Sequence, residues 1–106
     1  MYTLLRDLNN PNLHAIVHLP TFSWGPCEDG TNWFDSPAKA LDVAFNSNQP
    51  FYTEDQTDED LHFQQFSSVE DYCIALQTHP NYVSPEVVCH FESPDNFFEQ
   101  FPELLL

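Results

Sequence analysis

Hydrophobic and polar positions along the chain predict short strands separated by short helices. The predicted strands cover residues 13–19, 51–53, 61–66 and 86–91. In the first, Leu13, Ala15, Val17 and Leu19 alternate with His14, Ile16 and His18, which predicts one apolar and one polar face. The last is a nearly continuous apolar run, which favours a central place in a sheet. The third loses its alternation at Gln64 and Gln65, where a bulge fits.

Three segments have the helical period, and each follows a serine. The predicted helices cover residues 37–46, 69–78 and 94–101. Their expected buried stripes are Ala38, Leu41, Ala44 and Phe45; Val69, Tyr72, Cys73 and Leu76; and Phe97, Phe98 and Phe101. A serine hydroxyl accepts hydrogen bonds from the free amides of a first helical turn, so Ser36, Ser67 or Ser68, and Ser93 are the expected caps. Pro37 and Pro94 suit the first helical position because its amide has no helical partner.

These elements predict an α+β protein. We expect a mainly antiparallel sheet of four or five strands and three short Ser-capped helices, in a single compact domain that spans residues 1–106. Ten phenylalanines argue against a disordered acidic tail, because disordered chains contain few large aromatic residues. The apolar tail 104–106 either packs under the sheet or forms a patch that meets a partner.

The charge of the chain is strongly negative and uneven. Seventeen acidic residues face two basic ones, a formal net charge of -15. Residues 54–106 carry twelve of the acids and no Lys or Arg, and the run 54–60 alone holds five. A solvated acidic loop is the ordinary explanation for such a run, but here the charge continues beyond it. An excess of this size destabilises a small domain by self-repulsion, so it calls for a functional reason.

Several function classes are excluded by the same composition. Direct nucleic-acid binding needs Lys and Arg to neutralise phosphates, and anionic membranes would repel the chain. The first ten residues lack the basic and apolar segments of a signal peptide, and no stretch is apolar enough to span a membrane. Three cysteines without framework spacing favour reduced thiols, so we expect a cytoplasmic protein.

Motifs with chemical content are incomplete. An EF-hand loop that begins at Asp55 would need Gly at position 60 and Glu at position 66, where the chain has Asp60 and Phe66. Trp24-Gly25-Pro26-Cys27 resembles the end of the thioredoxin motif, but the position of the attacking cysteine is missing. His14 and His18 are too few for a zinc site, and adjacent Cys89 and His90 face opposite sides of a strand. We therefore predict no catalytic residues, no metal and no cofactor.

What remains is a protein that binds another protein. Carboxylates fixed on a folded surface can take the place of phosphates in a basic cleft, and they accept the same charge-assisted hydrogen bonds from arginine. The leading hypothesis is a small inhibitor that mimics DNA or RNA and blocks a nuclease, restriction enzyme or CRISPR complex, as anti-restriction and anti-CRISPR proteins of phages and plasmids do. The expected partner-binding residues are Glu54, Asp55, Asp58, Glu59, Asp60, Glu70, Asp71, Glu92, Asp95 and Glu99.

Two alternatives come from other classes. The first is an immunity or adaptor protein for a basic toxin or enzyme that does not handle nucleic acid. The second is an enzyme that uses paired carboxylates of the run 54–60, although a catalytic acid needs a buried site that raises its pKa, and this run is hydrophilic.

Overall fold

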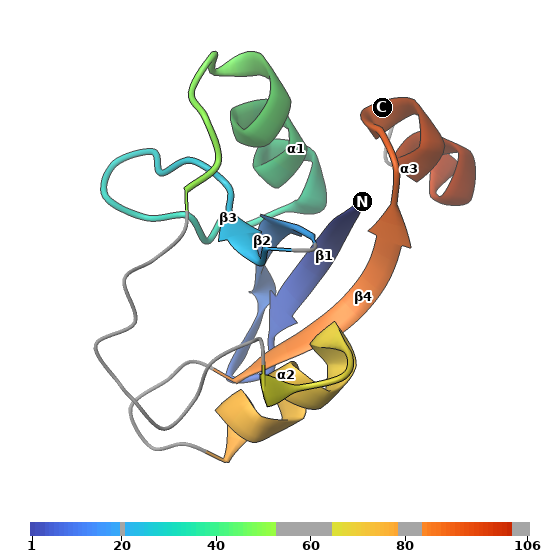
Figure 1. The fold of residues 1–106 in the computed structure, drawn as a ribbon. Helices are drawn as coiled ribbons and strands as arrows, with labels where there is room; N and C mark the ends of the chain where they lie inside the picture. Colours follow the sequence, from blue (N-terminus) through green and yellow to red (C-terminus); the bar gives the residue numbers. More distant parts are fainter. Residues whose placement is uncertain (20, 53–64, 79–83, 103–106) are drawn as a thin grey trace.

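A computed structural model describes residues 1–19, 21–52, 65–78 and 84–102 (Figure 1). It contains a four-stranded antiparallel sheet in the order β3-β2-β1-β4, together with three helices. The elements are β1 (Tyr2–Asp7), β2 (Asn10–His18), β3 (Ser23–Trp24), α1 (Pro37–Asn46), α2 (Val69–Gln77), β4 (Pro85–Phe91) and α3 (Pro94–Gln100). The predicted α+β class and the antiparallel sheet are confirmed. The acidic run 54–60, most of the predicted strand 61–66 and the tail 104–106 lie outside the described residues.

One of the two inner strands of the sheet is β1, which the sequence pattern did not predict. It pairs with β2 through a tight hairpin and with β4 on its other side. Thr3, Leu4 and Leu5 are all buried, because helices cover both faces of the sheet. A strand that is buried on both faces shows no alternation of apolar and polar residues. The hairpin turn lies at Leu8 and Asn9, where the Asp7 side chain accepts the Asn9 amide at 2.9 Å.

Two hydrophobic cores lie on opposite faces of the sheet (Figure 1). The α1/α3 core contains Leu4, Ile16, Phe34, Ala40, Leu41, Val43, Ala44, Phe91 and Phe97. The α2 core contains Leu5, Ala15, Val17, Phe22, Trp24, Val69, Tyr72, Cys73 and Leu76. Because Ile16 is only 2% exposed, the polar face predicted for residues 13–19 is wrong.

Each helix begins at a serine cap, as predicted. The hydroxyl oxygens of Ser36, Ser68 and Ser93 accept the backbone amides of Lys39, Asp71 and Asn96 at 3.1, 3.2 and 3.1 Å. Ser68 rather than Ser67 therefore caps α2.

The buried stripe predicted for α2 is confirmed, since Val69, Tyr72, Cys73 and Leu76 are all buried. The buried stripe of α1 is rotated slightly from the predicted one. Ala38 is exposed, whereas Ala40 and Val43 are buried beside the predicted Leu41 and Ala44.

β4 lies at an edge of the sheet among the described strands, so the predicted central position is wrong. Its apolar run has another cause. Leu4 pairs with Cys89 and Leu5 with Val87, which leaves Val88 as an extra residue in a bulge. Val88 and Cys89 therefore both pack against the α1/α3 core, while Val87 packs against the α2 core.

Two smaller predictions also need correction. In the predicted strand 51–53, the described part contributes only an isolated bridge between Tyr52 and Trp24. At the end of the predicted strand 61–66, Gln65 lies in a 3-10 turn and Phe66 in a bend, because the chain is already turning toward α2.

Candidate functional site

The predicted partner-binding acids fall into three groups. Glu54, Asp55, Asp58, Glu59 and Asp60 lie outside the described residues. Glu70 and Asp71 occupy the first turn of α2, where negative charge suits the helix dipole. Glu92, Asp95 and Glu99 lie at the junction of β4 with α3 and along α3. All five described acids are exposed.

The structure does not gather these five carboxylates into one cluster. α2 packs on one face of the sheet and α3 on the other, and both helices contact β4 (Figure 1). The acids therefore lie on both sides of the β4 edge. Negative side chains flank this edge strand, and a partner that grips the edge would meet both groups.

His90 connects β4 to the start of α2. Its Nε2 lies 2.6 Å from Oε1 of Glu70, and its Nδ1 lies 2.7 Å from Oγ1 of Thr3. The hydrogen bond from His90 is the main reason why the pKa of Glu70 is lowered. Sequence analysis missed this pair because the two residues are 20 positions apart and meet only when α2 packs on the sheet.

A hydroxyl, an imidazole and a carboxylate in a row are the groups of an acyl-transfer relay, but the burial of Thr3 argues for another role. Thr3 has no exposed surface and belongs to an inner strand of the sheet, so a substrate could not reach its hydroxyl. The three hydrogen-bonded side chains instead hold the first turn of α2 against β1 and β4.

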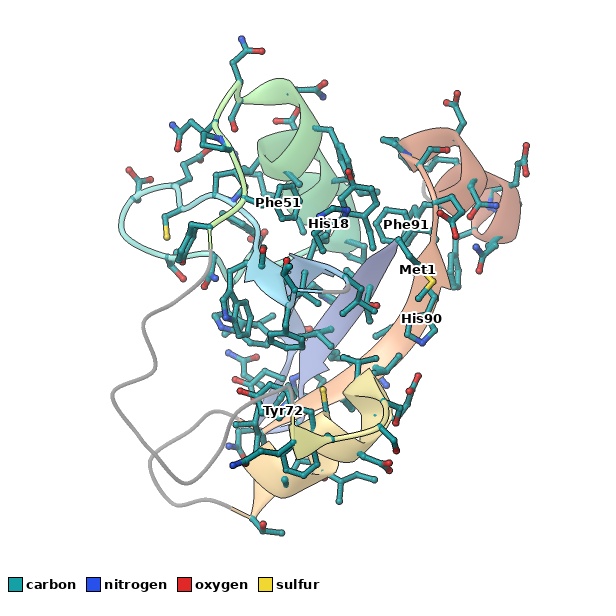
Figure 2. All side chains as sticks on the ribbon, in the orientation of Figure 1. Met1, His18, Phe51, Tyr72, His90 and Phe91 are labelled. Carbon is teal, nitrogen blue, oxygen red and sulfur yellow. The ribbon has the colours of Figure 1, made fainter. Side chains whose placement is uncertain are left out.

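Beside His90 lies a pocket of about 310 Å³. Met1, Leu19 and Val69 form its apolar wall, and Ser67, Ser68, Glu70 and His90 supply its polar groups. Figure 2 shows Met1 and His90 next to each other at the end of the sheet. Met1 is 45% exposed, so the pocket is open to solvent on that side.

Both basic side chains of the chain already have acidic partners. Nε of Arg6 donates to Oε1 of Glu86 at 2.6 Å, and Nζ of Lys39 lies 2.8 Å from Oε1 of Glu28. The hydrogen bond to Glu28 is the main cause that raises the pKa of Lys39. Arg6 and Lys39 are the only Lys or Arg residues in the sequence, and both pair with other glutamates. No Lys or Arg side chain is therefore paired with Glu70, Asp71, Glu92, Asp95 or Glu99.

Two of the three thiols are poor nucleophiles. Burial raises the pKa of Cys73 to about 12 and that of Cys89 to about 11. Cys27 is exposed, and its sulfur lies 3.3 Å from the Tyr52 hydroxyl.

The two histidines of β2 make structural contacts. Nδ1 of His14 lies 3.0 Å from the Asn12 carbonyl oxygen, and burial is the main cause that lowers the pKa of His14. The His18 ring packs on Tyr2 with 4.6 Å between ring centroids, in an aromatic cluster that includes Phe51 and Phe91 (Figure 2). Within the described residues, three or more His, Cys, Asp or Glu side chains nowhere approach closely enough to hold a metal ion.

None of the helices in the described part of the chain is long and apolar enough to cross a membrane. No protein-family model, curated protein or solved structure matches the chain.

Proposed function

We propose that the protein is a cytoplasmic inhibitor that binds the basic cleft of a nucleic-acid-binding protein by mimicking DNA or RNA. The observation that carries the proposal is that the negative charge of the protein is not balanced by its own basic residues. The formal net charge is -15, and both basic side chains are already paired with glutamates. The excess negative charge is thus left for a partner to neutralise.

The exposed acids around β4 suit such a partner in two ways. Carboxylates on helices and strands are held at fixed positions, and an arginine fork binds them with the same charge-assisted hydrogen bonds that it makes to phosphates. Uncompensated charge also attracts a basic cleft from a distance and raises the association rate. Inhibition of this kind requires neither catalysis nor a cofactor.

The proposal is tested by capture at two salt concentrations. The tagged protein is incubated with lysate of the source organism at low salt, and bound proteins are eluted with high salt. We expect a basic nuclease, restriction enzyme or CRISPR complex that added duplex DNA or RNA displaces from the tagged protein. If the captured partner resists salt and nucleic acid does not compete, the proposal is wrong. A basic partner that nucleic acid cannot displace would instead favour an immunity or adaptor protein.

A pair of charge-matched variants separates a local surface from net charge. One variant changes Glu92, Asp95 and Glu99 to amides, and the other changes Asp29, Asp35 and Asp42 to amides. All six residues are exposed, and each variant removes three negative charges. Exposed ion pairs contribute roughly 0.5 kcal/mol each, so the first variant should weaken partner binding about tenfold. The second should weaken it much less, and equal losses would contradict a binding surface at β4 and α3.

A further inference from the structure

The pocket beside His90 combines an apolar wall with one carboxylate, that of Glu70. Its wall of Met1, Leu19 and Val69 offers surface to an apolar stem, and Glu70 lies at the polar side with its side chain 49% exposed. Asp71 follows in the same helical turn. A pocket with this composition suits a group that is apolar along its length and positive at its end.

The size and charge of the pocket narrow the choice of occupant further. At about 310 Å³ the pocket lies at the small end of the range for ligand sites, roughly 300–1,000 Å³, so it fits one side chain better than a nucleotide or a large cofactor. An anion would be repelled by Glu70, which lines the pocket, and by the net charge of -15. The amides of the α2 terminus would favour an anion, but the Ser68 hydroxyl already accepts the Asp71 amide.

We propose that this pocket binds one arginine side chain of the basic partner, with its methylenes against Met1, Leu19 and Val69 and its guanidinium beside Glu70 and His90. The inference rests on the proposed function, and it names the residue type that the partner inserts. Arginine fits better than lysine for two reasons. Its planar guanidinium binds a carboxylate through two donors and stacks on flat rings, and it is more weakly hydrated than an ammonium group. Its long stem packs on apolar surface while the charge stays near water.

The chain offers a sensitive reporter for this site, because Met1 is its only methionine. In protein labelled at the methionine methyl group, one NMR signal reports on the pocket wall. The probe is N-acetyl-arginine amide, titrated at low salt, with the citrulline and lysine analogues as matched controls. Citrulline has the shape of arginine without its charge. We expect the arginine compound to shift the Met1 signal with the highest affinity, the lysine compound to bind more weakly, and the citrulline compound weakest.

Two charge-matched variants locate the interaction. Glu70→Gln removes the carboxylate at the pocket, and Asp35→Asn removes an exposed carboxylate that does not line the pocket. A partly exposed ion pair of about 1 kcal/mol corresponds to a loss of about fivefold, so Glu70→Gln should weaken the arginine compound by roughly three- to fivefold. Asp35→Asn should change the affinity by less than about 1.5-fold, because Asp35 does not line the pocket.

Three results would overturn the inference: an unmoved Met1 signal, equal affinity for the citrulline compound, or equal losses in the two variants. These outcomes are separate from those of the capture experiment. If the Met1 signal does not move but the capture experiment yields a partner that nucleic acid displaces, the arginine site is refuted and the proposed mimicry stands. An arginine-dependent Met1 shift without any basic, nucleic-acid-competed partner would support the site and refute the proposed function.

Discussion

The start of α2 gives the sharpest test of the local physics, because two adjacent serines compete for one role. The Ser68 hydroxyl accepts the Asp71 amide at 3.2 Å, whereas the neighbouring Ser67 hydroxyl donates to the exposed Asp71 carboxylate at 3.0 Å. Loss of a serine cap typically costs about 1 kcal/mol, and loss of an exposed side-chain hydrogen bond costs a few tenths. Ser68→Ala should therefore destabilise the protein clearly more than Ser67→Ala.

Urea unfolding followed by circular dichroism measures the difference. Small proteins lose roughly 1–3 kcal/mol of stability per molar urea, so Ser68→Ala should lower the midpoint by about 0.3–1 M. Because α2 buries Tyr72, Cys73 and Leu76 against the sheet, the cost should appear in global unfolding and not only as fraying. Ser68→Gly should recover most of the loss, since glycine is tolerated at the cap. A larger effect for Ser67→Ala than for Ser68→Ala would refute the assignment.

Three further predictions concern packing, pH and thiol chemistry. Phe97→Ala should cost about 3–5 kcal/mol in urea unfolding because Phe97 is fully buried, whereas Ile74→Ala, at a position that is 58% exposed, should cost under about 0.5 kcal/mol. Since the folded-state pKa of Glu70 is lowered, its ionised form stabilises the protein above the ordinary pKa of 4.5, by at most about 1 kcal/mol at this half-exposed site. The stability difference between wild type and Glu70→Gln should accordingly shrink as the pH falls below 4.5, and a growing difference would contradict a stabilising hydrogen bond from His90 to the Glu70 carboxylate. In native protein a thiol reagent should modify exposed Cys27 and spare buried Cys73 until denaturant is added, as mass spectrometry of the labelled peptides would show.

The helices were predictable because their signals are local. A serine, a proline at the first helical position and an apolar stripe lie within about ten residues, and the bounds of α1 match the prediction. For α2 the order of residues left Ser67 and Ser68 as alternative caps. Only the packing of the helix against the sheet decides between them.

The sheet was less predictable because both of its faces are covered. Burial of Leu4 on one face and Leu5 on the other removes the alternation that identifies a half-buried strand, and so β1 went unpredicted. The same double coverage buries Ile16, which alternation had placed on a polar face. A bulge in β4 adds Val88 to the apolar run, which made an edge strand resemble a central one.

Only the negative charge of the candidate site could be predicted from the sequence. Glu70, Asp71, Glu92, Asp95 and Glu99 are exposed, in keeping with their charge. Their division between two faces of the sheet, the contact of Glu70 with His90 and the pocket at Met1 all depend on tertiary packing. No pattern within ten residues of Glu70 identifies His90 as its partner.

The pairing of β1 with both the next strand and the last one has a consequence for synthesis on the ribosome. Once β1 and β2 have emerged, they can form their hairpin, but the opposite edge of β1 stays bare until Pro85–Phe91 has been translated. An open edge with free amides and carbonyls invites pairing between nascent chains. A chain truncated before residue 85 should therefore aggregate, and adding a peptide with the sequence of β4 should restore it by strand complementation.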